Sequence, residues 1–138
     1  MREGLGAMRL LTAYLAILFA MAAIDLVWLG VVARKFYRDQ LGSLLRDKPR
    51  LLPAAAFYLL YPIGILMFAS LPGSEARSVL HAGVLGTAFG FFAYATYDLT
   101  NLAVLRGWPV LLAFVDMAWG SVLTGLCAAA GTWISLKF

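Results

Sequence analysis

Apolar residues fill four long stretches of the chain, each interrupted by only a few polar positions. The stretches run over residues 10–33, 51–71, 79–105 and 109–136. A helix needs about 20 apolar residues to cross the hydrocarbon core of a bilayer, and each stretch reaches that length. Hydrophobic residues make up 63% of the 138 positions and charged residues 13%, against about 25% charged in an average soluble domain. The pattern predicts an all-α fold, a four-transmembrane-helix bundle that forms a single integral membrane domain over residues 1–138.

The segment between the first two stretches has a different pattern. Over residues 35–47, apolar side chains such as Phe36, Tyr37 and Leu41 recur at helical spacing among basic ones. Such alternation is typical of a short amphipathic helix that lies in the membrane interface. We therefore predict an interfacial helix between the first and second spans. It would serve either as a connector on the membrane surface or as a lid over a polar site.

Basic residues are unevenly divided between the two ends of this predicted bundle. Seven of the eleven lysines and arginines fall on the end that holds the first-to-second and third-to-fourth loops. These seven are Arg34, Lys35, Arg38, Arg46, Lys48, Arg50 and Arg106. Loops rich in lysine and arginine stay in the cytoplasm, which predicts a multi-pass protein with both termini outside. The net charge of +4 is concentrated in one loop, so we expect membrane lipids as partners and no nucleic acid.

Three aspartates interrupt the apolar stretches: Asp25 in the first, Asp98 in the third and Asp116 in the fourth. A charged side chain at the bilayer centre costs roughly 2.5–3.5 kcal/mol on insertion scales, so it usually has a partner or a function. In antiparallel spans, each aspartate falls about seven or eight residues from the same end of the bundle, or roughly 10–12 Å at 1.5 Å per residue. The sequence therefore predicts one layer of carboxylates near the basic end.

Aromatic residues surround these aspartates at helical spacing. Trp28 follows Asp25 by three positions, and Trp119 follows Asp116 in the same way. Residues three or four apart share a helix face, so each aspartate is expected to lie beside the tryptophan of its own helix. The candidate ligand-binding or proton-linked residues of this polar layer are Asp25, Trp28, Tyr58, Tyr61, Tyr94, Tyr97, Asp98, Asn101, Asp116 and Trp119.

Four interpretations fit such a layer. We favour a site that binds or transports a small ligand or a proton. The alternatives are an intramembrane enzyme that acts on a lipid or isoprenoid substrate with an aspartate as general acid or base, a structural or assembly factor whose aspartates only form a hydrogen-bonded network, and a metal site. The only histidine, His81, falls near the opposite end. This position argues against zinc, and three carboxylates with a carbonyl would suit magnesium, manganese or calcium better. We predict no metal site and no cofactor, assign no catalytic residue, and leave open whether the protein is an enzyme.

Small residues recur at four-residue spacing in the last two spans, as in Gly86 and Gly90 and again in Ser121 and Gly125. This spacing lets helix backbones approach closely. It predicts tight contacts either within the bundle or between copies of the chain in a homo-oligomer.

Four motifs together resemble an uncharacterised bacterial family of four-helix integral membrane proteins, a domain of unknown function. The motifs are Asp25-x-x-Trp28, Phe57-Tyr58-x-x-Tyr61, Tyr97-Asp98-Leu99-Thr100-Asn101 and Asp116-x-x-Trp119-Gly120. The resemblance covers nearly the whole chain, from about residue 8 to residue 133, and the third motif is its most specific part. It implies the four-helix topology and the inner membrane of a bacterium, which would make the two termini periplasmic, and it implies no activity.

Overall fold

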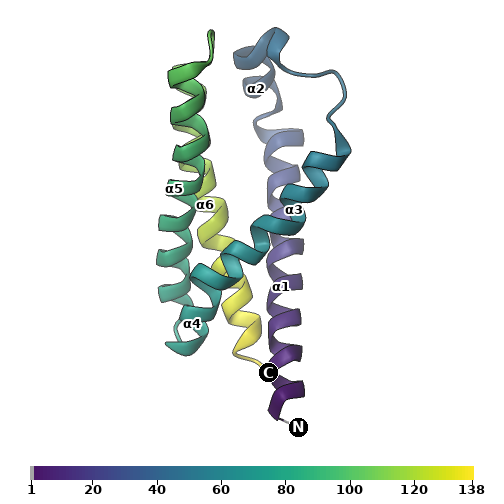
Figure 1. Cartoon of the computed structure of the whole chain (residues 1–138), viewed down its shortest axis with the longest axis vertical. Helices are drawn as coiled ribbons and strands as arrows, with labels where there is room; N and C mark the ends of the chain where they lie inside the picture. Colours follow the sequence, from purple (N-terminus) through teal and green to yellow (C-terminus); the bar gives the residue numbers. More distant parts are fainter. Residues whose placement is uncertain (1) are drawn as a thin grey trace.

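The computed structural model describes residues 2–138, which form an all-α bundle of four long helical rods and one short helix (Figure 1). The elements in chain order are α1 (Arg2–Val27) with a π-helical turn (Trp28–Val32), α2 (Arg34–Leu41) with a 3-10 turn (Gly42–Leu44), α3 (Leu51–Ile65) with a π-helical turn (Leu66–Ser70), α4 (Leu71–Glu75), α5 (Val79–Val104) and α6 (Val110–Ser135).

The four predicted spans are confirmed. Helices long and apolar enough to cross a membrane cover Gly6–Val32, Leu51–Glu75, Val79–Val104 and Val110–Ser135, and their ends differ from the predicted ends by at most four residues. Both termini lie at one end of the bundle, whereas α2 and the turn between α5 and α6 lie at the other (Figure 1). We call the latter the α2 end.

The short helix between the first two spans is also confirmed, but it ends earlier than predicted. The α-helix stops at Leu41, and the following 3-10 turn ends at Leu44 rather than continuing to residue 47. Gly42 has φ 53°, a left-handed conformation that glycine adopts without a steric penalty. Leu45 is then extended, with φ −78° and ψ 128°. A single glycine therefore ends a helix that the apolar spacing alone would have continued.

The closest helix pair is α5 with α6, and glycines make this contact possible. A Cβ atom added to Gly90 would lie 2.3 Å from the carbonyl oxygen of Gly120, and one added to Gly86 would lie 2.7 Å from the carbonyl oxygen of Thr124. No side chain fits at such distances, so these positions need glycine. The small residues Gly86 and Gly90 thus act within the bundle, as one of the two sequence interpretations expected.

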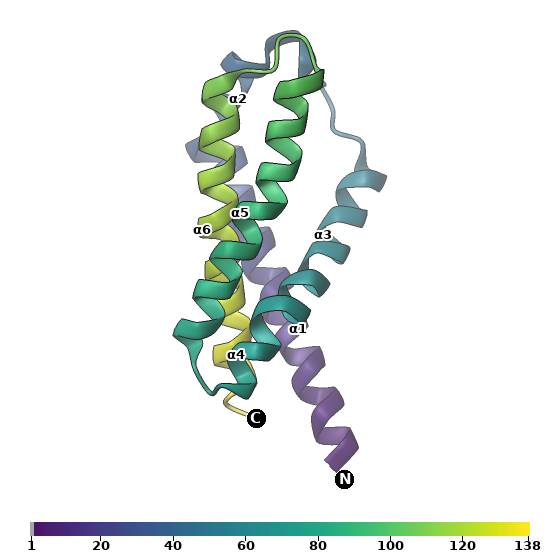
Figure 2. The same ribbon diagram turned by 60° about the vertical axis from the view of Figure 1, so that its left-hand side comes forward.

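Helix α3 runs obliquely to the other rods (Figures 1 and 2). Its continuation through Leu66–Ser70 and α4 packs against α5, whereas α3 itself packs mainly against α1. The side chains of Ile17, Ile65 and Leu123 are fully buried where α1, α3 and α6 meet. Toward the α2 end, α3 diverges from α5 (Figure 2). One side of the bundle is therefore closed at the terminal end and open at the α2 end.

Candidate functional site

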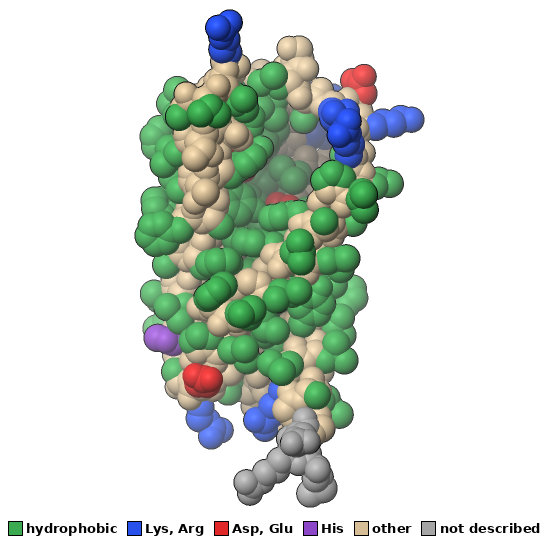
Figure 3. Space-filling view, in the orientation of Figure 1, with side chains coloured by type: hydrophobic (Ala, Val, Ile, Leu, Met, Phe, Trp, Pro, Cys, Tyr) green, Lys and Arg blue, Asp and Glu red, His purple; other side chains and the backbone are tan. Residues whose placement is uncertain are grey.

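A cavity of about 530 Å³ occupies the α2 end of the bundle, where α3 and α5 diverge. In the space-filling view this region is a hollow with acidic atoms at its base and apolar side chains around it (Figure 3). Its walls are mostly aromatic and aliphatic. The lining side chains belong to Asp25, Leu29, Tyr37, Leu41, Ala54, Phe57, Tyr58, Tyr61, Ala93, Tyr94, Tyr97, Trp108, Leu112, Asp116 and Trp119.

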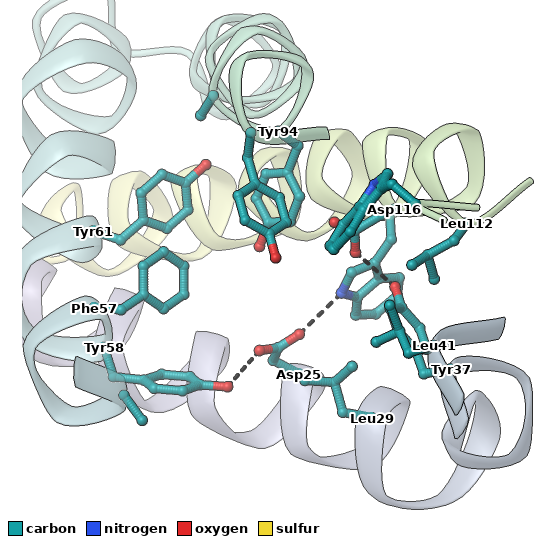
Figure 4. A pocket seen from close by; sticks show the side chains of 15 residues that line it. Asp25, Leu29, Tyr37, Leu41, Phe57, Tyr58, Tyr61, Tyr94, Leu112 and Asp116 are labelled. Atoms are coloured by element: carbon teal, nitrogen blue, oxygen red, sulfur yellow. Dashed lines mark hydrogen bonds between the residues drawn. The ribbon is translucent and has the colours of Figure 1, made fainter. Parts of the chain in front are cut away.

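Asp25 is the centre of one half of this site (Figure 4). The residue is only 5% exposed, yet both carboxylate oxygens have a donor. The Tyr58 hydroxyl donates to Oδ2, and Trp119 Nε1 donates to Oδ1 at 3.0 Å. A buried carboxylate is tolerated when such donors replace water. These contacts join α1, α3 and α6 around one acidic group.

Asp116 is the centre of the other half. The Tyr37 hydroxyl on α2 donates to Asp116 Oδ1 at 2.6 Å, and Trp28 Nε1 lies 3.4 Å from the Tyr37 oxygen as its donor. Tyr37 and Leu41 place one face of α2 over the cavity. The hydrogen bond from Tyr37 to Asp116 thus supports the interpretation of the interfacial helix as a lid.

The two tryptophans join these halves. Their rings are stacked with centroids 4.3 Å apart and an interplanar angle of 8°. Trp119 of α6 donates to Asp25 of α1 rather than to Asp116 of its own helix. The sequence expectation concerned a shared helix face, and the hydrogen bond of Trp119 crosses from that face to the neighbouring helix. Spacing along one helix fixes a shared face, but the rotation of that face toward its neighbours decides the partner.

The remaining tyrosines of the predicted layer pack around the cavity. The hydroxyls of Tyr61 and Thr124 are hydrogen-bonded at 2.7 Å. The Tyr94 ring lies directly on Gly120, where an added Cβ would come within 2.1 Å of the ring. The glycine of the fourth motif thus makes room for a cavity-lining ring.

Asp98 lies behind the cavity and does not line it. It is fully buried, and within the described part of the chain neither of its carboxyl oxygens has a hydrogen-bond partner. Asp116 and Trp108 are its polar neighbours, and Trp108 Nε1 is also without an acceptor there. Asn101, one turn further along α5, likewise lies outside the cavity lining.

Seven of the ten residues of the predicted layer therefore line one cavity, and three do not. Those that line it are Asp25, Tyr58, Tyr61, Tyr94, Tyr97, Asp116 and Trp119, whereas Trp28, Asp98 and Asn101 are not part of the lining. The prediction missed Tyr37 and Trp108. Both lie outside the four apolar stretches, Tyr37 on α2 and Trp108 in the turn before α6.

No basic side chain among the described residues forms a salt bridge with an aspartate of the site. Lys35 with Asp39 is the only salt bridge among the residues that the structure describes, and it lies on the exposed face of α2. Burial and the hydrogen bond to Asp116 raise the pKa of Tyr37, so this phenol remains a neutral donor. Within residues 2–138 there is no cluster of three or more His, Cys, Asp or Glu side chains that could hold a metal ion.

These features define a multi-pass helical membrane protein with an acidic, aromatic cavity at one end. The chain belongs to the predicted membrane protein family DUF2177, whose model matches residues 10–133. The resemblance seen in the four sequence motifs is thereby confirmed. No curated protein matches the chain, and no solved structure does.

Proposed function

We propose that this protein binds an amphiphilic molecule that enters the cavity sideways from the surrounding membrane. The observation that carries the proposal is the divergence of α3 from α5, beside which the cavity lies. In a bilayer the side of the bundle is covered by lipid, so an opening there admits molecules dissolved in the leaflet. A volume of about 530 Å³ is within the range of about 300–1,000 Å³ that is usual for small-molecule sites.

The walls indicate what kind of molecule would fit. Apolar rings such as Phe57 and aliphatic side chains such as Leu112 favour an acyl or isoprenoid chain. Asp25 has a donor on each oxygen, but Asp116 has a hydrogen bond on Oδ1 only. A hydroxyl, amine or amide of the ligand can therefore donate to Asp116 Oδ2. The favoured ligand has an apolar chain and at least one hydrogen-bond donor close to its polar end.

Basic residues at the opening add a preference for negative charge. Arg50 immediately precedes α3 and Arg106 follows α5, and both are exposed at the α2 end. Cations beside a membrane surface attract anionic lipid by about 1 kcal/mol each. A lysophosphatidylglycerol has the expected combination, because its phosphate is anionic and its glycerol carries a free hydroxyl below the phosphate.

The test is binding of this lipid to the protein in nanodiscs of zwitterionic lipid, with the bound lipid quantified by native mass spectrometry. We expect lysophosphatidylglycerol to bind more tightly than phosphatidylglycerol, in which the corresponding hydroxyl of the acylated glycerol is esterified. Ala93 lines the cavity, so the larger side chain of Ala93→Trp would occupy part of the cavity and should abolish binding. Leu80→Trp is the matched control, because Leu80 is 78% exposed on another part of α5. Equal binding to wild type and Ala93→Trp would contradict the proposal.

An enzyme acting on such an amphiphile is the second candidate, and the position of Asp116 favours it. This carboxylate lines the cavity with one oxygen free of a donor from another side chain, as a general base requires. Incubation with lysophosphatidylglycerol and phosphatidylglycerol in proteoliposomes, followed by mass spectrometry, tests it. A new product that Asp116→Asn fails to make would support catalysis. Unchanged lipids would contradict catalysis and leave binding as the proposed function.

We further infer that the α2 end faces the cytoplasm of a bacterial inner membrane. The support is the excess of basic residues in the loops at that end. Reporter fusions after Phe138 test it, since alkaline phosphatase should be active there and green fluorescent protein dark. The opposite result would invert the orientation without affecting the cavity.

A further inference from the structure

The Asp98 carboxyl group is the polar group whose surroundings the cavity does not explain. It is fully buried on α5, and none of the described residues donates a hydrogen bond to either oxygen. Its neighbour Asp116 is an acceptor too and already receives the Tyr37 hydroxyl. The nearby indole donor, Trp108 Nε1, forms no hydrogen bond with Asp98 either. Two acceptors therefore lie next to each other without a hydrogen bond to join them. Buried polar groups are nearly always paired, so this gap in the pairing needs an explanation.

The polar groups next to the pair come from α2, α5 and the turn before α6, and none of these described groups is cationic. Tyr37 approaches from α2, Tyr97 belongs to α5, and Trp108 comes from the turn before α6. No lysine, arginine or histidine within the described residues forms a salt bridge with either aspartate. Two negative charges on neighbouring carboxylates, without a cation beside them, repel each other, and one proton between them removes the repulsion.

We propose that Asp98 and Asp116 form a proton-binding site in which one proton is shared between the two carboxyl groups. Asp98 is the protonated partner, and its O–H donates to Asp116. The Asp116 carboxylate has about four lone-pair sites, so it can accept this bond, the Tyr37 hydroxyl and a ligand donor together. Binding of the proton neutralises one carboxylate, and its release leaves two facing negative charges. The site is distinct from the Asp25 half of the cavity, where Tyr58 and Trp119 supply the donors. It does not depend on what the cavity binds.

The position of this pair suggests what the proton could control. Asp116 is a member of the pair, lines the cavity and accepts the bond from Tyr37 that fastens α2. A second negative charge next to Asp116 would change the strength and direction of that bond. The bound proton is therefore placed to influence both the hydrogen bond of Asp116 to a ligand and the attachment of α2 over the cavity.

Infrared spectroscopy of the protein in an ester-free detergent tests the proposal directly. A protonated carboxylic acid has a C=O stretch that a carboxylate lacks, and this band shifts in D₂O. We expect one such band at neutral pH that disappears at alkaline pH. The band should be absent in Asp98→Asn and also in Asp116→Asn, because either amide supplies the missing donor itself. Asp39→Asn, which changes an exposed aspartate on α2, should keep the band.

If one of the two variants fails to fold, the other still tests the proposal. The titration of the wild-type protein needs neither variant. A band that both Asp98→Asn and Asp116→Asn retain would overturn the proposal, as would a wild-type spectrum with no protonated acid at neutral pH. A comparison of buffers with and without sodium distinguishes a bound proton from a bound sodium ion. Replacing sodium by choline should leave the titration unchanged, and a shift of the band by sodium would assign the site to that ion instead.

Discussion

Replacement of Asp25 offers the sharpest test of how the cavity is held together, because its two donors respond differently. Trp119 Nε1 can only donate, whereas the Tyr58 hydroxyl can donate or accept. In Asp25→Asn, the amide oxygen can keep the bond from Trp119 while the amide NH₂ donates to Tyr58. Both bonds survive without the charge. Bonds to charged groups exceed neutral ones by roughly 1 kcal/mol, so we expect a loss of about 1–2 kcal/mol.

Asp25→Leu has a similar volume but no acceptor, so both donors lose their partner. An unpaired buried donor costs about 1–3 kcal/mol. Since Tyr58 and Trp119 are only partly buried, we expect the lower part of this range for each, or about 2–4 kcal/mol in total. The free energy of unfolding would be measured by denaturant titration in mixed micelles, followed by near-ultraviolet circular dichroism. The stacked rings of Trp28 and Trp119 provide the signal.

A double-mutant cycle with Tyr58→Phe isolates the interaction. In the wild-type background, Tyr58→Phe removes a bond to a carboxylate and should cost about 1.5–3 kcal/mol. In the Asp25→Leu background it removes a donor that is already unpaired, so it should be neutral or stabilising. Asp39→Asn on the exposed face of α2 should change the stability by less than about 0.5 kcal/mol. The reasoning is refuted if Tyr58→Phe costs the same in both backgrounds.

Further outcomes are expected from the glycine contacts and from Tyr37. Gly90→Ala should destabilise the protein by about 1–3 kcal/mol or more, because the new Cβ would lie 2.3 Å from the carbonyl oxygen of Gly120; Gly30→Ala meets open space and should cost nothing, so equal losses would count against the packing argument. Tyr37→Phe removes the donor to Asp116 and should increase amide hydrogen exchange in α2 several-fold; unchanged exchange would show that this bond does not hold the helix. Burial raises the pKa of Tyr37, so above about pH 10 the unfolded chain loses a proton that the folded chain keeps, and the stability falls as the pH rises. Tyr37→Phe should lack this part of the fall, and an identical slope in the variant would contradict it.

The fold could be predicted from the sequence because a bilayer demands about 20 apolar residues per span. The limits of α5 and α6 follow directly from the apolar stretches. The end of α2 could not be predicted in this way, because the left-handed conformation of Gly42 is visible only in the folded chain. The depth of Asp25 was predictable for the same reason as the spans, since a fixed rise per residue converts position into depth.

The pairing within the site was less predictable. The bond between Tyr37 and Asp116 joins residues 79 positions apart and depends on how α2 folds back over the end of the bundle. The partner of Trp119 depends on how α6 is rotated against α1. Residue spacing carries information about one helix at a time. Contacts between helices therefore appeared only in three dimensions, and with them the contrast between the fully bonded Asp25 and the unpaired Asp98.

The divergence of α3 from α5 has a consequence for how affinity should be expressed. A molecule that reaches the cavity through the side of the bundle is drawn from the leaflet, so its mole fraction in the membrane sets the occupancy. An apparent Kd in aqueous units would then change with the amount of lipid in the assay, although the intrinsic affinity stays constant. Detergent monomers would compete through the same opening, so their chain length and charge become experimental variables. Occupancy measured at several lipid-to-protein ratios separates partitioning from binding.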